Sequence, residues 1–241
     1  MVNKYLLLWL EAPLQSWGVD SKFNRRDTLK FPTKSGVFGL ILCGLGASGP
    51  QNELLSKLAQ GQMSVFSFAR SKINKNSEVK VKINQEPLLR DFQMVGSGYD
   101  DKDIWQKLLI PKTSEGKPAV GGGAKLTYRY YLQDARFAVI LEISNDLVES
   151  VSKAFQEPAY DIYLGRKNCV PTDIVFRGVF DAFDKAKEEL FKVAENKNLI
   201  LDFRVVDGEI EEEGDVITLN DVPIQFGEIK KYRDRRVTII S

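Results

Sequence analysis

The residues best suited to chemistry lie in segment 31–46, where a polar loop turns into a short apolar stretch. Pro32 disfavours helix at the residue before it. Thr33 and Ser35 can each cap a helix that begins near Lys34. The first-turn amides of such a helix have no acceptor within the helix, and the lysine adds positive charge beside them. The pattern predicts a phosphate-binding helix end, and an ordinary capped core helix is the alternative.

A basic loop precedes this segment and contains Arg25 and Arg26, with Gln15, Ser16 and Trp17 a few residues earlier. A cationic loop beside an exposed tryptophan is typical of a site for a sugar-phosphate backbone with one stacked base. The alternative is a solvated loop whose tryptophan packs on the core.

Two later segments repeat this combination of cations with aromatic or glycine residues. Arg129 lies within a run of tyrosines at 128–131, which can stack on unpaired bases or pack across strands. Arg166 and Lys167 follow Gly165, and a glycine turn with two cations can clamp a phosphate. A solvated basic turn is the other interpretation of the second segment.

The chain contains no histidine, and its two cysteines are far apart. The usual nucleophilic triads and most catalytic zinc and iron sites are thereby excluded. We therefore expect a protein that is not an enzyme, with no catalytic residue, metal or cofactor. A metal-independent endoribonuclease using Tyr, Lys or Ser is the alternative function, and a small-molecule-binding α+β domain is a third.

Composition and the N-terminal segment indicate where the protein is expected to be found in the cell. The chain has 241 residues, 43% hydrophobic content and a formal net charge of +1, which is ordinary for a globular protein and indicates no particular partner. The apolar run near the N-terminus is interrupted by Glu11 and Pro13 and has no small-residue cleavage site. We expect a cytoplasmic protein without a membrane partner.

The spacing of apolar residues predicts the helices and strands that must position these side chains. Apolar patterning predicts strands at 3–11, 63–70 and 136–143 and helices in 31–46, 51–60 and 146–155. Residues 44–49 spell G-x-G-x-x-G, but they close a helix and do not follow a strand, so we interpret them as a helix stop. Segment 71–126 is weakly patterned and glycine-rich, which predicts an inserted arm. The order of elements predicts an α+β fold of the ferredoxin-like or RRM-like kind.

The last third of the chain predicts a helix at 184–195 and strands near 199–206 and 216–219. The acidic turn 209–213 should face away from any RNA, and 237–240 should form a closing edge strand. We expect a core at 1–145, which includes the arm, and a small β-rich C-terminal part at 146–241 that completes it.

Four segments, in this order, are similar to the CasD family, the subtype I-E member of the RAMP proteins of CRISPR-Cas systems. They are 12–18 (APLQSWG), 31–40 (FPTKSGVFGL), 128–137 (YRYYLQDARF) and 163–169 (YLGRKNC). A looser likeness runs from Phe226 to Arg236.

The resemblance implies a non-catalytic subunit of Cascade, the RNA-guided surveillance complex. Such a subunit holds the 5′ handle of the CRISPR RNA (crRNA), caps the backbone of CasC subunits and contacts CasA. Its arm acts as a thumb, and it reaches target DNA only through the complex. A subtype I-C relative cleaves precursor RNA with a histidine, which this chain lacks. The RNA-contact positions that the resemblance implies are Gln15, Ser16, Trp17, Arg25, Arg26, Thr33, Lys34, Ser35, Arg129, Arg166 and Lys167.

Overall fold

The computed structural model describes residues 3–18, 21, 24–73, 80–95, 102–110, 112–117, 125–210 and 214–241. Its strands are β1 (Asn3–Glu11), β2 (Leu14–Gln15), β3 (Arg25–Arg26), β4 (Met63–Ile73), β5 (Lys80–Lys82), β6 (Leu89–Val95), β7 (Lys125–Gln133), β8 (Arg136–Ser144), β9 (Phe176–Phe180), β10 (Leu199–Asp207), β11 (Asp215–Gln225) and β12 (Lys231–Ile240). Its helices are α1 (Lys34–Leu45), α2 (Asn52–Leu58), α3 (Ile104–Leu109), η1 (Asn145–Leu147), α4 (Val148–Gln156) and α5 (Phe183–Asn196).

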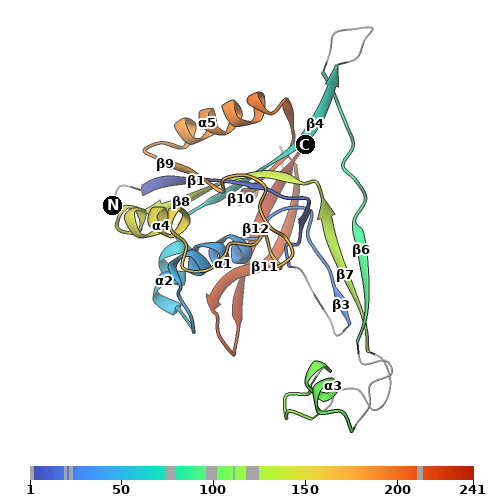
Figure 1. Ribbon diagram of the computed structural model, residues 1–241. Coiled ribbons are helices and arrows are strands. Elements are labelled where there is room, and N and C mark those ends of the chain that lie inside the picture. Colours follow the sequence, from blue (N-terminus) through green and yellow to red (C-terminus); the bar gives the residue numbers. More distant parts are fainter. Residues whose placement is uncertain are drawn as a thin grey trace.

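The core is an eight-stranded sheet with helices on both faces (Figure 1). β1 lies between β8 and β9 and is buried on both sides, as its continuous apolar run predicts. Successive side chains of a strand point to opposite faces. Leu6 and Leu8 accordingly pack with α1, whereas Leu7 and Trp9 pack under α5.

The C-terminal strands extend this sheet in the order β11-β12-β10-β4-β8-β1-β9. Every neighbouring pair along this path is antiparallel. The prediction of an edge strand at 237–240 is wrong, because β12 contains these residues and lies between β10 and β11. β11 forms that end of the path instead, and β9 (Phe176–Phe180) at the opposite end was not predicted.

Helix α1 has the ends that its sequence predicts. The Thr33 side chain accepts a hydrogen bond from the amide of Gly36, and Gly46 ends the helix with a φ of 67°. A Cβ at Gly44 would lie 2.3 Å from the carbonyl oxygen of Ala154, so this glycine allows α4 to approach closely. Both the helix start and the glycine stop are confirmed.

Segment 71–126, predicted as an arm, contains two projections. The end of β4 pairs with β5 on one side of the molecule, while β6 pairs with β7 and leads to α3 on the other (Figure 1). We call the paired strands β6 and β7 the ribbon. The glycine-rich stretches of this segment at 96–98 and 121–123 lie outside the described residues.

In the part of the chain that the structure describes, no helix is long and apolar enough to cross a membrane. Within the same residues, His, Cys, Asp and Glu side chains do not form any group of three or more that could hold a metal ion.

Candidate nucleic-acid interface

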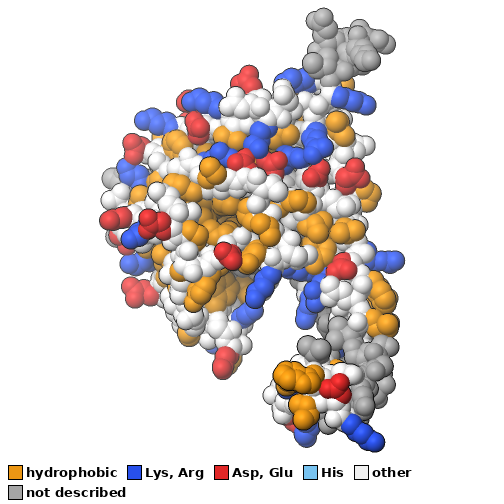
Figure 2. All heavy atoms as spheres, in the orientation of Figure 1, with side chains coloured by type: hydrophobic (Ala, Val, Ile, Leu, Met, Phe, Trp, Pro, Cys, Tyr) orange, Lys and Arg blue, Asp and Glu red, His pale blue; other side chains and the backbone are white. Residues whose placement is uncertain are grey.

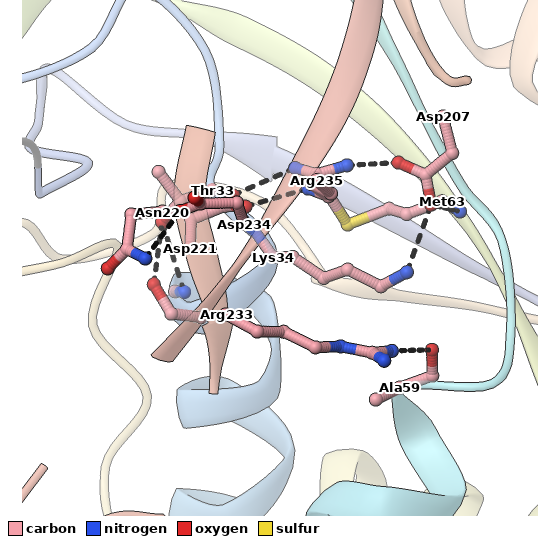
Figure 3. Close-up of polar contacts among 12 residues, drawn as sticks. Thr33, Lys34, Ala59, Met63, Asp207, Asn220, Asp221, Arg233, Asp234 and Arg235 are labelled. Carbon is pink, nitrogen blue, oxygen red and sulfur yellow. Dashed lines mark hydrogen bonds and ion pairs between the residues drawn. The ribbon is translucent and has the colours of Figure 1, made fainter. Parts of the chain in front are cut away.

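The N-terminal end of α1 was the first predicted phosphate site, and the structure encloses it. Lys34 is only 4% exposed. Its Nζ lies 2.9 Å from Oδ2 of Asp207 (Figure 3). The same nitrogen donates a hydrogen bond of 2.7 Å to the carbonyl of Gly61. The lysine charge is therefore neutralised inside the protein.

A carboxylate occupies the place where a phosphate would bind. Oδ2 of Asp221 accepts a 2.8 Å hydrogen bond from the backbone amide of Lys34. Arg235 donates to both oxygens of Asp221, at 2.7 and 2.8 Å, and also pairs with Asp207. We call Lys34, Asp207, Asp221 and Arg235 the buried charge cluster (Figure 3). It joins α1 to the C-terminal strands β10, β11 and β12.

Burial and pairing shift the pKa values of Lys34 and Arg235 in opposite directions. Burial lowers the pKa of Lys34, and the nearby carboxylate of Asp207 only partly opposes it. Burial also acts to lower the pKa of Arg235, but its hydrogen bonds and its attraction to Asp221 and Asp207 outweigh burial and raise that pKa. The arginine therefore stays charged and compensates the two carboxylates.

The structure contradicts the prediction that this helix end holds a phosphate. Thr33 is 1% exposed and caps α1, and the Ser35 hydroxyl donates to Oγ1 of Thr33 at 3.3 Å. The amides at a helix N-terminus do attract an anion, as predicted. In this fold the anion is Asp221. Thr33 and Lys34 are buried, and the half-buried Ser35 bonds to the capping threonine.

The prediction that Trp17 is exposed is also wrong, and the alternative that it packs in the core is confirmed. Trp17 is 1% exposed, and its indole nitrogen donates to Oε1 of Gln15 at 3.1 Å. Nε2 of Gln15 donates to the carbonyls of Leu10 and Ala135 at 3.1 and 2.7 Å. These two side chains are fully engaged in the core and lack a face for RNA.

Ser16 instead positions the glycine turn. Its amide donates to the carbonyl of Leu164 at 3.1 Å. Gly165 has a φ of 105°, and a Cβ there would lie 1.8 Å from the carbonyl oxygen of Ser16. Only glycine fits this approach, so the buried motif 15–17 holds the turn that carries Arg166 and Lys167.

The turn places Arg166 against the ribbon. The guanidinium of Arg166 lies 4.6 Å from the ring centroid of Tyr131 and donates to the carbonyl of Arg26 at 3.1 Å. Its Nη1 is buried without a hydrogen-bond partner among the described residues. Lys167 beside it is exposed. A buried unsatisfied donor next to exposed cations favours an anion such as phosphate.

The register of β3 on β7 sorts the predicted arginines onto two faces. Arg26 pairs with Arg129 and Arg25 pairs with Tyr128, in parallel. Because side chains alternate along a strand, Arg26 and Arg129 share the face that carries Tyr131. We call this the inner face, since Tyr131 packs in the main core. Arg25 lies on the opposite, outer face, with its guanidinium 4.9 Å from the ring centroid of Tyr130.

Four predicted residues thus come together at the base of the ribbon. We call Arg26, Arg129, Arg166 and Lys167 the basal cation cluster. Within the described part of the chain, none of the four forms an ion pair. Figure 2 shows Lys and Arg side chains on both sides of the hollow between the body and the arm. The cluster is a positively charged surface suited to a sugar-phosphate backbone.

Sequence reasoning missed the acidic half of the buried charge cluster. Asp221 lies 187 positions from Lys34, and no local pattern links the two. One signal was present, because Asp221 interrupts the strand-like run from Val216 to Ile224. A lone acid in such a run indicates a buried partner.

Comparison with known proteins extends this picture. The family model described as CRISPR-associated protein (Cas_Cas5) matches residues 5–238. The CRISPR system Cascade subunit CasD of Escherichia coli (strain K12) is 30% identical over 189 residues, which cover 77% of this chain and 75% of that protein.

Solved structures agree with this match. A chain of a CRISPR RNA-guided surveillance complex superposes with a TM-score of 0.69 at 24% identity, over 98% of this chain and 89% of that one. A crystal structure of a Cas protein gives a TM-score of 0.58 at 25% identity, over 98% and 93%. The first likeness shows a shared mixed α/β fold rich in sheet. With a family model that covers nearly the whole sequence, the chain belongs to the Cas5 family of CRISPR-associated proteins, with CasD among its relatives.

Proposed function

We propose that this protein is a non-catalytic, RNA-binding subunit of a Cascade surveillance complex in the cytoplasm. It holds the 5′ handle of the crRNA, caps the backbone of CasC subunits, contacts CasA and reaches target DNA only through the complex. The observation that carries the RNA contact is the basal cation cluster, which lacks ion-pair partners within the described residues and includes an unsatisfied Arg166 donor. The CasD relative, named as a Cascade subunit, supports the assembly.

We further propose that the core is ferredoxin-like. Four adjacent strands follow the order β4-β8-β1-β9. Helix α1 lies between β1 and β4 in the chain, and α4 lies between β8 and β9. Two β-α-β units interleaved in one antiparallel sheet are the arrangement of the split βαβ fold, and this arrangement supports the proposal.

Charge reversal at two exposed positions tests the RNA contact. We expect the Arg26→Glu, Lys167→Glu double variant to lose most of the guide RNA that copurifies with the assembled complex, because two phosphate contacts become repulsive. The matched control is Lys185→Glu on α5, an exposed lysine outside the cluster. RNA content is measured per complex after purification. Unchanged RNA content in the double variant would contradict the proposal.

The thumb role requires a separate test. Val95 and Lys125 are direct register partners, so residues 96–124 can be replaced by an Asn-Gly turn that closes the ribbon. We expect a folded protein that no longer joins the CasC backbone, as measured by pull-down. Normal assembly of the shortened chain would show that the arm is not an assembly element.

The absence of catalysis is tested by incubating the purified protein with CRISPR repeat RNA. We expect intact RNA, since the sequence has no histidine to act as a general base near neutral pH. Sequence-specific cleavage would overturn the non-catalytic assignment and favour an endoribonuclease that uses Tyr, Lys or Ser.

A further inference from the structure

The outer face of the ribbon carries a row of aromatic rings and guanidinium groups that the basal cation cluster does not include. The guanidinium of Arg25 lies 4.9 Å from the ring centroid of Tyr130, and that of Arg90 lies 5.8 Å from the centroid of Tyr128. The rings of Phe92 and Tyr128 are 5.4 Å apart. We call these five residues the aromatic platform.

Strand register places the platform on one face. Arg90 lies directly opposite Tyr130, and Phe92 lies directly opposite Tyr128. Side chains of directly opposed residues project to the same side of a sheet. The intervening residues, Asp91 and Arg129, project to the inner face. The platform and the basal cation cluster therefore lie on opposite faces of the same strands.

Arg25, Arg90 and Phe92 of the platform are exposed, and its two tyrosines are half-buried. Phe92 is 53% exposed, and the Arg25 side chain is 62% exposed. Nε of Arg25 donates to both carboxylate oxygens of Asp27, at 2.8 and 2.9 Å. This pairing uses only Nε of Arg25 and holds its guanidinium over Tyr130. The Phe92 ring, exposed and in contact with Tyr128, does not belong to the core.

We propose that the aromatic platform binds unpaired bases of single-stranded RNA by stacking. The inference rests on the proposed function and deepens it, because it adds a second contact surface to the same guide. Every base has a π-face, so a row of rings holds successive bases without reading their sequence. Arg25 and Arg90 stack beside these rings and donate to phosphates.

The chemistry of the platform favours nucleic acid over a protein partner. The platform combines two guanidinium groups with three aromatic rings, which suits a ligand that carries phosphates and flat bases. The outer face becomes purely apolar only beyond Phe92, at Met94 and Leu126, which are 55% and 39% exposed. A protein that covers the platform is the competing outcome in the test below.

Site-specific photo-crosslinking in the assembled complex identifies the occupant. Phe92 is replaced by the photoreactive residue p-benzoylphenylalanine, and the complex is irradiated. The control places the same residue at Phe191, a 37% exposed phenylalanine on α5. We expect an RNase-sensitive adduct at position 92 and none at 191. An adduct to a protein subunit at position 92, or no adduct there, would overturn the inference.

A second variant removes the π-faces and keeps the apolar volume. We expect Phe92→Leu, Tyr128→Leu to weaken guide binding about tenfold, in the range seen when one stacked base is lost. Circular dichroism checks folding. Wild-type complex without RNA would defeat the proposed function itself. RNA that is retained and depends on Arg26 and Lys167, but binds the double leucine variant with unchanged affinity, would defeat only the platform.

Discussion

The buried charge cluster and the basal cation cluster both contain lysine and arginine, but only the first includes carboxylates of its own. Lys34 and Arg235 are enclosed, and each lies within hydrogen-bond reach of a carboxylate. Arg26 and Lys167 are exposed and form no ion pair within the described part of the chain. The first cluster is internally neutralised, whereas the second leaves positive charge for an external anion.

This difference shows which property separates a structural cation from a binding one. Both clusters adjoin features that attract phosphate, a helix N-terminus in one case and a glycine turn in the other. At the helix, a side chain of the same protein already supplies the anion. At the glycine turn, a buried arginine donor has no partner among the described residues. Ion pairing among the described residues, and not the number of lysines and arginines, distinguishes the two sites.

The largest effect is expected from removing the internal anion. Asp221→Ala removes the partner of the first amide of α1 and one of the two carboxylates that pair with Arg235, and breaking a buried ion pair costs about 3–5 kcal/mol. Urea unfolding measures the loss. The control is Asp234→Ala, which removes an exposed carboxylate bonded to Asn220 and should cost about 1 kcal/mol or less. A variant of normal stability that loses guide RNA would show that the helix end binds RNA after all.

Substitutions in the basal cation cluster should leave stability almost unchanged and weaken RNA binding. Arg26→Glu, Lys167→Glu is expected to change the free energy of unfolding by about 0.5 kcal/mol or less, because both side chains are exposed and neither forms an ion pair with another described residue. The slope of log affinity against log salt concentration should fall by about 0.7 for each phosphate that the variant no longer neutralises. Titrations of labelled RNA at several salt concentrations give the slope. A large loss of stability with an unchanged slope would assign this cluster a structural role.

A smaller effect is expected at the helix cap. Thr33→Ala removes the hydrogen bond to the amide of Gly36 and should cost about 1 kcal/mol. Guide RNA content should stay the same, since Thr33 is buried. Thr33→Ser is the matched control, because it retains the capping hydroxyl. If the alanine variant lost RNA while its stability stayed normal, Thr33 would be shown to contribute to RNA binding.

The smallest effect concerns acid pH at a third charge group. Burial acts to raise the pKa of Glu11, but hydrogen bonds from Trp9 and Lys197 and the charges of Lys197 and Arg136 outweigh it and lower the pKa below its ordinary 4.5. A carboxyl whose folded-state pKa is lowered stabilises the protein above the unfolded pKa. That stability is lost as pH falls from 4.5 through the folded value.

Unfolding free energies measured between pH 7 and pH 3 check this expectation. Glu11→Gln should be less stable than the wild type at pH 7, and the difference should shrink as the pH falls. Glu115→Gln, at an exposed carboxylate, is the control and should leave the pH profile unchanged. A constant difference across the range would show that Glu11 contributes no pH-dependent stability.

Local patterns predicted much of the fold. The start and stop of α1, the doubly buried β1 and the strands β4 and β8 all follow from neighbouring residues, because caps, glycine stops and alternation are short-range effects. The strands β9 and β12 were missed or misplaced. Their positions depend on pairing with strands far away in the chain, and a short apolar run does not specify its neighbours.

The candidate site shows the same limit more sharply. The sequence predicted a phosphate at the N-terminus of α1, where the structure has the carboxylate of Asp221, and it identified the residue types at the base of the ribbon. It could not show that Asp221, 187 positions from Lys34, bonds to the first amide of that helix, or that Asp207, 173 positions away, pairs with the lysine side chain. It also could not show that Arg25 and Arg26 lie on opposite faces, since the register with β7 decides this.

By itself, then, the sequence determined the ends of α1, the positions of the central strands β1, β4 and β8, which residue types were present and, through four ordered segments, the Cas5 relationship. Only the tertiary structure decided which cations are neutralised and which remain available. The physical reason is that charge availability depends on distance to opposite charge and on burial, and both are set by contacts between residues far apart in the chain.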